Sequence, residues 1–273
     1  MGTVFSNMPF LPLIESGYMR MLDGIFARRR QPTPSASILK ACKLVAHRGE
    51  HDNLTVMENS LAAFERAADA DVWGVELDIR WTKDFVPVVF HDADLSRLFN
   101  RPEQIGRLSF NELRERVDVI PKLAEVVERF GGKLHLMIEI KHHDWPDPKR
   151  QSRALIETLA PLVPAEAYHL MVLDPAIMAH LDGFTTRCMI AIAYHWPDRY
   201  SRWVIENNWG GLATHYSVLR RSHIERHQSK GQRVGTAFPA SRNCLFRELN
   251  RGVDFIFSNH AAPLQTIIGR SCP

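Results

Sequence analysis

Acidic residues occupy alternate positions in two of the most apolar stretches of the chain. Glu76 and Asp78 lie within residues 73–80, where the positions between them are apolar, and Glu139 lies in the same way within residues 135–141. Alternate residues of a β-strand share a face, so each stretch predicts one apolar face and one face with carboxylates. Carboxylates inside a protein are costly unless positive charge neutralises them. The spacing therefore predicts a buried carboxylate group that needs cations.

Two interpretations account for these carboxylates. In the first they form structural salt bridges, with Arg80 as one partner. In the second they bind a divalent cation, because hard cations prefer carboxylate oxygens. Three carboxylates from neighbouring strands suit Mg²⁺ or Ca²⁺, with Mn²⁺ as a third candidate, and suit Zn²⁺ poorly. We favour the second interpretation, with Glu76, Asp78 and Glu139 as the metal ligands.

Two histidines follow short apolar runs that read as extended segments. His47 is followed by Arg48 and Gly49, which suit a phosphate: Arg offers a forked donor set and Gly lets the backbone approach closely. His91 ends a second extended run, which would return it to the same site. The pair could act as general base and general acid while Arg48, Lys141 and a cation offset the charge on a phosphoryl group.

Strand-like and helix-like runs alternate from about residue 43 onward, which predicts an α/β fold, a (β/α)₈ TIM barrel. The expected strands are 43–47, 73–80, 135–141, 168–173, 187–194, 210–215, 233–237 and 254–258. The expected helices are 60–69, 121–130, 149–160, 175–181, 199–207, 217–228, 241–250 and 261–268. In such a barrel the chemistry lies at the carboxyl ends of the strands. The polar clusters described above follow strands, as this arrangement requires.

The first 40 residues predict a separate N-terminal helical extension, and residues 41–273 predict the barrel domain. Residues 10–26 can form an amphipathic helix, and residues 31–37 have the composition of a linker. The helix could be a peripheral membrane-surface anchor or a flap near a lipid-like substrate, or it could close the bottom of the barrel. No apolar run is long enough to span a bilayer, so we expect a cytoplasmic protein, with surface contact to a membrane as the alternative.

The charge distribution argues against nucleic acid as a partner. Residues 1–43 hold six Lys and Arg against two acidic residues, so the formal net charge of +3 belongs to this leader and the rest of the chain is close to neutral. The four cysteines are far apart and form no metal-binding or disulfide pattern, which predicts free thiols. Trp196, Trp203 and Trp209 are expected to pack between helices and barrel. The oligomeric state stays open.

The motifs between residues 44 and 141 resemble those of the glycerophosphodiester phosphodiesterase family, which are phospholipase-C-like TIM-barrel enzymes. The shared motifs are His47-Arg48-Gly49, Glu58-Asn59-Ser60, Glu76-x-Asp78, Thr82-x-Asp84, His91-Asp92, Ile120-Pro121 and Glu139-x-Lys141. The resemblance implies metal-dependent hydrolysis of a glycerophosphodiester to glycerol 3-phosphate and an alcohol. It implies that His47 and His91 are the acid/base pair and that Arg48 and Lys141 bind phosphate. In some members the second histidine also contacts metal.

Departures from the family pattern fall on the substrate side of the site. Phe238 stands near a position where the family has Trp, and Asn259 stands where it has Asp. Residues 93–99 also differ from the family sequence. The alcohol part of the substrate is therefore open, and the alternatives are a lysophospholipase-D-like enzyme that acts on membrane lysolipids and a non-catalytic barrel that binds a phosphorylated ligand.

Overall fold

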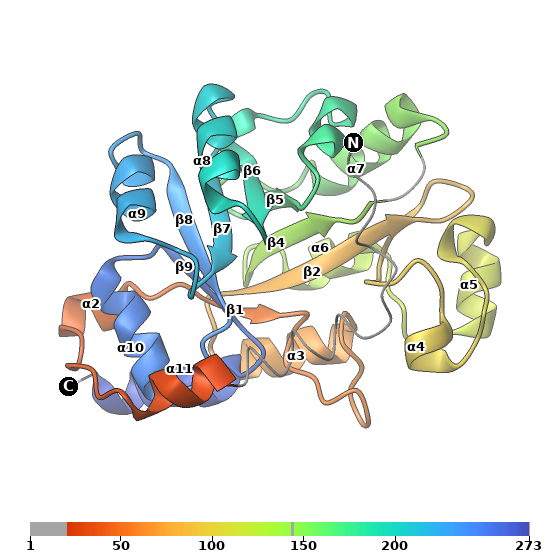
Figure 1. Cartoon of the computed structure of the whole chain (residues 1–273). Coiled ribbons are helices and arrows are strands. Elements are labelled where there is room, and N and C mark those ends of the chain that lie inside the picture. Colours follow the sequence, from red (N-terminus) through yellow and green to blue (C-terminus); the bar gives the residue numbers. More distant parts are fainter. Residues whose placement is uncertain (1–20, 143–144, 273) are drawn as a thin grey trace.

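Eight parallel strands close into a barrel in the computed structural model, which describes residues 21–142 and 145–272. The barrel strands are β1 (Leu44–His47), β2 (Gly74–Trp81), β4 (His135–Ile140), β5 (Tyr168–Val172), β6 (Met189–Ala193), β7 (Gly211–His215), β8 (Arg233–Ala237) and β9 (Phe255–Ser258). Closure comes from β1, which pairs with both β9 and β2. The expected (β/α)₈ barrel is confirmed (Figure 1).

Helices follow the strands and cover the outside of the barrel. They are α3 (Leu61–Asp69), α6 (Leu123–Phe130), α7 (Pro148–Leu159), α8 (Pro197–Glu206), α9 (Arg221–Gln228), α10 (Arg242–Arg251) and α11 (Ala261–Ser271). Ser60 and Ser241 cap α3 and α10 by accepting a hydrogen bond from a backbone N–H in the first turn. The segment expected as a helix at 175–181 is instead a 3₁₀ helix, η2 (Pro175–His180). The segment has only six residues, and short helical connections of this kind often adopt 3₁₀ geometry.

Alternation along the strands separates the core into two parts. On β2, Val75, Leu77 and Ile79 pack outward against the helices, in the same apolar cluster as Phe64 of α3. A second cluster fills the inside of the barrel, and it consists of Val45, Met137, Met171, Ile190, Ala213, Phe255 and Phe257. These side chains form a closed apolar floor beneath the polar residues of the mouth.

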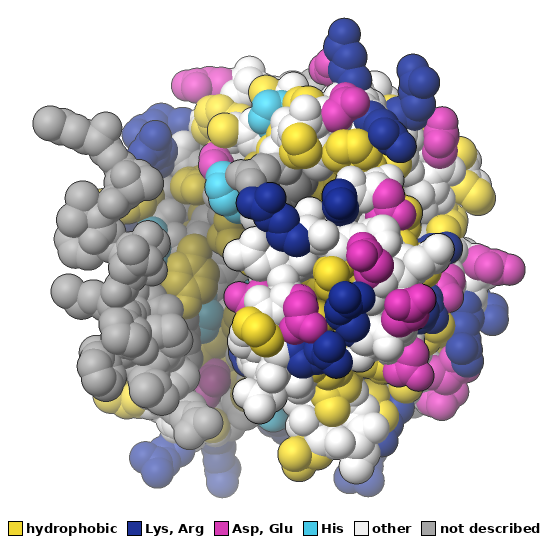
Figure 2. All heavy atoms as spheres, turned by 90° about the vertical axis from the view of Figure 1, so that its right-hand side faces the viewer, with side chains coloured by type: hydrophobic (Ala, Val, Ile, Leu, Met, Phe, Trp, Pro, Cys, Tyr) yellow, Lys and Arg dark blue, Asp and Glu magenta, His cyan; other side chains and the backbone are white. Residues whose placement is uncertain are grey.

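A small subdomain stands beside the barrel between β2 and α6 (Figure 1). It begins with β3 (Pro87–Val89), which pairs antiparallel with β2, and contains α4 (Ser96–Phe99), η1 (Ile105–Arg107) and α5 (Phe110–Arg116). It has its own apolar cluster, which includes Phe90 and Leu113. The face that carries α4 and α5 bears acidic and basic side chains intermixed (Figure 2).

The leader helix lies beside the mouth of the barrel. Residues 21–28 are its described part, and residues 10–20 of the expected helix lie outside the described residues. Tyr216, which directly follows β7, donates a hydrogen bond to Asp23 and packs edge-on against Phe26, with ring centroids 5.4 Å apart. The expectation that the helix closes the bottom of the barrel is therefore wrong for these residues. The carboxyl end of β7 offers the aromatic and hydrogen-bonding partners that hold them.

From the mouth, the leader runs along α10 toward the amino ends of the strands. Asn243 donates to the backbone oxygen of Ala27 at 2.7 Å, and Asn250 donates to that of Pro32 at 2.9 Å. The short helix α2 (Ala36–Lys40) then leads into β1. Among the helices of the described residues, none combines the length and the hydropathy needed to cross a membrane.

Candidate active site

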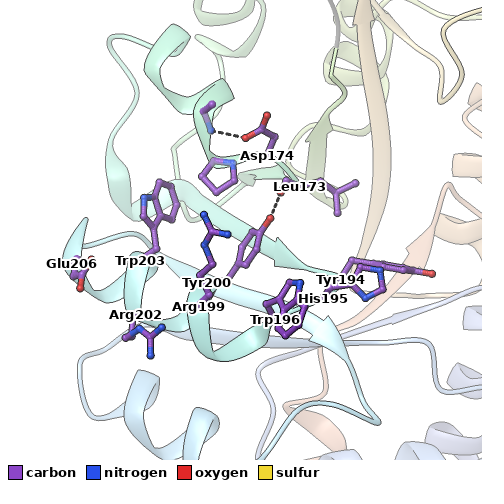
Figure 3. A pocket seen from close by; sticks show the side chains of 12 residues that line it. Leu173, Asp174, Tyr194, His195, Trp196, Arg199, Tyr200, Arg202, Trp203 and Glu206 are labelled. Atoms are coloured by element: carbon purple, nitrogen blue, oxygen red, sulfur yellow. Dashed lines mark hydrogen bonds between the residues drawn. The ribbon is translucent and has the colours of Figure 1, made fainter. Parts of the chain in front are cut away.

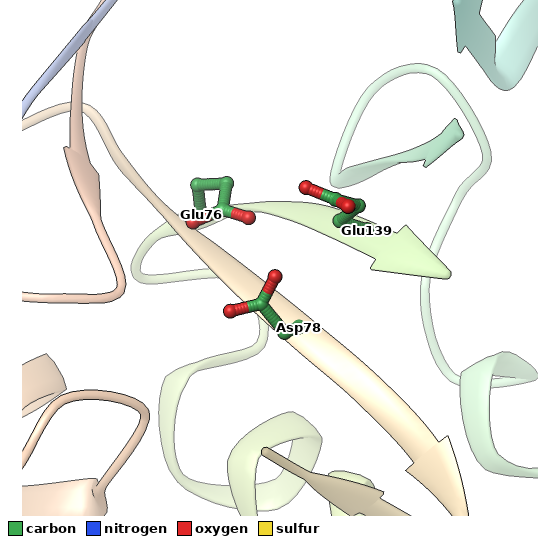
Figure 4. A group of neighbouring side chains, drawn as sticks. All are labelled: Glu76, Asp78 and Glu139. Carbon is green, nitrogen blue, oxygen red and sulfur yellow. The ribbon is translucent and has the colours of Figure 1, made fainter. Parts of the chain in front are cut away.

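Three carboxylates converge inside the mouth of the barrel (Figure 4). Glu76 and Asp78 come from β2 and Glu139 from β4, and one oxygen of each lies within 4.8 Å of the other two. The parallel register of the two strands pairs Asp78 with Glu139, so the side chains meet at one level. All three are buried. The structure therefore brings together the carboxylate group that the alternation predicts.

Burial and neighbouring charges together shift the pKa values of the three carboxyl groups. Burial raises the pKa of Glu76 well above its ordinary value, and the charges of Asp78 and Glu139 add to the shift. Burial also raises the pKa of Glu139, although Lys141 opposes the change. For Asp78 burial is outweighed by Lys141 and Arg48, which hold its pKa below the usual range. Cation binding needs deprotonated ligands, so it would release protons from this cluster.

Two cations touch the three carboxylates directly. Lys141 Nζ lies 2.9 Å from Asp78 Oδ1 and also contacts Glu139. Arg48 Nε lies 3.3 Å from Asp78 Oδ2, and the Arg48 backbone N–H donates to Glu76 Oε2 at 3.1 Å. Three carboxylates against two cations leave one net negative charge in the fully ionised group. A divalent cation would make the centre positive, which suits a phosphodiester monoanion.

Arg80 does not form the salt bridge that the alternative interpretation of the carboxylates requires. Its guanidinium donates to two backbone oxygens instead, from Nε to His91 at 2.9 Å and from Nη1 to His142 at 3.0 Å. These bonds hold the start of the β3–α4 segment and the end of β4 together. The structural role of Arg80 is thus to join the loops of the mouth, and the carboxylates are left to other partners.

The residues present fit a divalent cation. Glu76 Oε1 is buried, and no donor among the described residues makes a hydrogen bond to it. A buried carboxylate oxygen without a donor is costly in a protein interior. All the converging ligand atoms are carboxylate oxygens, the type that Mg²⁺, Ca²⁺ and Mn²⁺ prefer. The identity of the ion is not determined by this donor set.

A tight turn after β1 shapes the phosphate-facing side. Arg48 and Gly49 both have left-handed backbone angles, with φ of 58° and 77°. A Cβ at Gly49 would lie 2.8 Å from the backbone of Ala63 in α3, so only glycine fits this close approach. The turn aims the Arg48 backbone N–H at Glu76 while its side chain reaches Asp78. This geometry explains why Arg and Gly directly follow the histidine.

His47 presents one ring nitrogen to the carboxylates. Its Nδ1 lies 2.6 Å from Asn259 Oδ1, which can only accept, so Nδ1 carries the proton and Nε2 keeps a lone pair. That Nε2 lies 3.7 Å from Glu76 Oε2. Burial and the nearby Arg48 charge lower the pKa of His47 to about 3, so the ring is neutral near pH 7. The Phe238 ring packs 4.6 Å from the ring of His47. Asn259 and Phe238, two residues that differ from the family pattern, therefore both contact His47.

His91 reaches the mouth on the extended arm formed by β3, as expected from its sequence. The N–H of Phe90 donates to the backbone oxygen of Asp78 at 2.9 Å, which brings the arm to the level of the carboxylates. His91 Nδ1 lies 2.7 Å from Asp92 Oδ1. A carboxylate on Nδ1 orients the ring and stabilises an imidazolium, so Nε2 is available for proton transfer.

Sequence reasoning missed the role of two residues between β1 and α3. Asn59 Nδ2 donates to Asp78 Oδ2 at 2.7 Å, and its Oδ1 accepts from the Asp78 backbone N–H at 3.1 Å. Asn59 thus clamps one metal-ligand candidate in place. Glu58 is buried and accepts from Arg48 Nη1 at 2.9 Å. The motif Glu58-Asn59-Ser60 was visible, but the local signal in it was only that of a helix cap at Asn59 or Ser60, and the structure places the cap at Ser60.

A pocket of about 770 Å³ lies between η2 and α8, at the carboxyl ends of β5 and β6, and its lining does not include the carboxylates or histidines described above (Figure 3). Leu173 and Tyr194 follow the two strands, and Tyr200 of α8 donates to the backbone oxygen of Leu173 at 2.7 Å. Trp196 is 75% exposed at its edge, so the expectation that it packs in the interior is wrong. Its left-handed backbone, with φ of 60°, turns the chain just before α8 begins and leaves the ring outside.

Fold and site together define a (β/α)₈-barrel protein with three converging carboxylates and two histidines at its mouth. The model of the "Glycerophosphoryl diester phosphodiesterase family" matches residues 47–183, half of the chain, including every site residue named above from His47 to Lys141. The chain belongs to this family.

Curated relatives match over part of their length. "Glycerophosphodiester phosphodiesterase 1" from Bos taurus is 30% identical over 161 residues, which are 51% of this chain and 47% of the relative. A "Glycerophosphodiester phosphodiesterase" from Caldanaerobacter subterraneus subsp. tengcongensis is 37% identical over 111 residues, which are 36% of this chain and 44% of the relative. The chain thus matches at most about half the length of these two relatives.

Solved structures share the fold at low sequence identity. A phosphodiesterase from Oleispira antarctica, in complex with the product sn-glycerol-3-phosphate, has a TM-score of 0.72 and 21% identity, with 83% of this chain and 96% of that chain covered. A glycerophosphodiester phosphodiesterase from Thermotoga maritima has a TM-score of 0.69 and 23% identity, with 83% and 98% covered. At this level of sequence identity the comparison shows only that the barrel fold is shared.

Proposed function

We propose that this protein hydrolyses a glycerophosphodiester to glycerol 3-phosphate and an alcohol, with a divalent cation at Glu76, Asp78 and Glu139. The observation that carries the proposal is the convergence of these buried carboxylates with two histidines at one mouth. Family membership and a structural neighbour that holds sn-glycerol-3-phosphate support the substrate class.

The reaction needs one proton removed from the nucleophile and one proton given to the departing oxygen, and each histidine carries out one of these transfers. His47 is the general base, because its neutral ring presents a free Nε2 beside Glu76. His91 is the general acid that protonates the departing alcohol oxygen, because Asp92 holds its Nδ1 and leaves Nε2 available for proton transfer. We assign His91 as a proton donor. The alternative is that His91 is a metal ligand, and the experiments below distinguish the two roles.

Positive charge at the mouth meets the phosphate. Arg48 and Lys141, already turned toward the carboxylates, would bind phosphoryl oxygens and hold the substrate between the histidines. A divalent cation, when bound, supplies further positive charge for the oxygens of the phosphoryl group. Mg²⁺ and Ca²⁺ are the first candidates, with Mn²⁺ third.

A panel of phosphodiesters tests the proposal directly. Released glycerol 3-phosphate would be measured with and without EDTA, and then after Mg²⁺, Ca²⁺ or Mn²⁺ is restored. The proposal predicts metal-dependent release from glycerophosphodiesters. Release of the phosphorylated alcohol instead of glycerol 3-phosphate would contradict it, because the other ester bond of the diester would then be the one that is cleaved. No hydrolysis under any metal would also contradict it and would favour a barrel that only binds a phosphorylated ligand.

A lysophospholipase-D-like reaction is the second candidate, and the pocket between η2 and α8 favours it. Leu173, Tyr194 and Trp196 are exposed by 40%, 43% and 75%, and they offer apolar surface at the carboxyl ends of β5 and β6, the same end of the barrel as the site. Such a surface suits a substrate with an acyl chain. The substrate pair that separates the candidates is a lysophospholipid and the matching glycerophosphodiester without its chain. A clear preference for the lysophospholipid would support the second.

The leader helix is proposed as a peripheral membrane contact on a protein that is otherwise cytoplasmic. Residues 1–40 would form the extension and residues 41–273 the catalytic domain. With Phe26 docked on the barrel, Met21 and Ile25 remain exposed by 56% and 41%, one turn apart on the helix. Exposed apolar residues of this kind favour contact with a lipid surface.

A further inference from the structure

Arg97 joins two carboxylates that come from different segments of the chain at the mouth. Its Nε lies 2.6 Å from Asp92 Oδ2, and its two Nη atoms make a fork on Glu58, with Nη1 at 3.2 Å from Oε2. Arg97 belongs to α4 of the subdomain, whereas Glu58 belongs to the loop between β1 and α3 of the barrel. The guanidinium therefore bridges two parts of the chain that close on the site.

Each carboxylate that Arg97 holds also contacts a residue of the proposed chemistry. Asp92 uses its second oxygen, Oδ1, to accept from His91 Nδ1. Glu58 accepts from Arg48 Nη1 as well as from Arg97. A carboxylate that orients a histidine can rotate about its own side chain unless its other oxygen is held. Arg97 supplies that second attachment for Asp92.

We propose that Arg97 is a positioning residue for His91, acting through Asp92, an inference that rests on the proposed function. By holding Asp92 Oδ2, Arg97 keeps Oδ1 on Nδ1 of His91 and so keeps Nε2 aimed at the departing alcohol oxygen. Arg97 itself touches neither substrate nor cation in this role. A planar guanidinium suits it, because one group can hold Asp92 and Glu58 at once.

A purely structural role for Arg97 predicts different behaviour, and the chain provides a matched control. Arg101 lies in the same segment, has nearly the same exposure (42% against 44% for Arg97), and pairs with Glu103 at 2.8 Å. This pair has no contact with Asp92 or Glu58. If Arg97 only ties the subdomain down, Arg97→Gln and Arg101→Gln should both act through stability alone.

The experiment compares Arg97→Gln, Asp92→Asn and Arg101→Gln on two substrates, glycerophosphocholine and bis(4-nitrophenyl) phosphate. The second has a leaving group that needs no proton. We expect Arg97→Gln and Asp92→Asn to lower kcat on glycerophosphocholine on the order of 10–100-fold, with KM nearly unchanged, and to lower it much less on the aryl diester. Arg101→Gln should match the wild type on both substrates.

A double-mutant cycle with His91→Ala completes the test. If Arg97 acts through His91, Arg97→Gln should lower kcat no further in the His91→Ala background. Equal losses on both substrates, a raised KM, or an undiminished loss in the His91→Ala background would overturn the inference and point to the Glu58–Arg48 contact or to stability. A wild-type protein that hydrolyses neither substrate would instead overturn the proposed function, so the two failures are distinguishable.

Discussion

A pair of histidines at the amino ends of the strands makes folding sensitive to acid. His135 Nδ1 donates to the backbone oxygen of Glu166 at 3.0 Å, so its Nε2 is the acceptor of a 2.7 Å hydrogen bond from His169 Nδ1. Trp73 stacks on His135 with ring centroids 4.2 Å apart. Both histidines are buried, the hydrogen bonds require His135 to be neutral, and burial disfavours a charge on His169.

Burial lowers the pKa of His135 to about 3 and that of His169 to about 4. In the unfolded chain both return to about 6.5. The unfolded state therefore binds more protons below that value, and stability is lost as pH falls from about 6.5 toward 4. At pH 5, roughly 1.5 units below the unfolded pKa, each histidine costs ~2 kcal/mol and the pair ~4 kcal/mol, at about 1.36 kcal/mol per unit.

Urea unfolding of the wild type and of His135→Gln/His169→Gln at about pH 8 and pH 5, both in EDTA, measures this effect. Other titrating groups are common to the two proteins and cancel in the comparison. The wild type should lose roughly 4 kcal/mol more than the variant between the two pH values. A difference below ~1 kcal/mol would refute the reasoning, because it would mean that the pair accepts protons in the folded state.

Three further predictions concern the site and the leader. Glu76→Gln and Asp78→Asn should lose metal affinity, measured by calorimetry, with the fold intact; full activity of either variant in metal-free buffer would contradict the ligand assignment. His47→Ala and His91→Ala should each lose on the order of 10²–10⁴ in turnover on an unactivated diester. On an aryl diester His91→Ala should recover much of its rate and His47→Ala should not, and identical losses on both substrates would favour His91 as a metal ligand. Deletion of residues 1–35 removes the contacts of Asp23 and Phe26 with Tyr216, so it should lower the melting temperature by more than the ~2–4 °C that roughly 1 kcal/mol produces, and should abolish liposome binding while hydrolysis of a soluble diester persists. If the truncated protein has an unchanged melting temperature and the full-length protein does not bind liposomes, the leader would neither stabilise the barrel nor contact a membrane.

The sequence by itself determined the strands and the residues of the centre. Period-2 alternation in residues 73–80 and 135–141 separates carboxylates from apolar side chains. This pattern is local, so it can be recognised in the sequence without knowledge of the fold. The eight barrel strands lie within two residues of their expected ends for the same reason. Helix boundaries were less accurate at 175–181 and 217–228, where short turns replace helical residues.

Tertiary structure alone decided which distant residues complete the centre. The parallel register of β2 and β4 sets Asp78 level with Glu139, and no local pattern specifies a register between strands. Closure of the barrel brings Asn259 to His47, and the subdomain brings Arg97 to Glu58. Asn259 and Glu58 lie on loops and Arg97 on the four-residue helix α4, and the direction of such segments depends on what they pack against and not on their own sequence. The residue types of the chemistry are thus readable along the chain, while the groups that orient them come from contacts made only when the barrel closes.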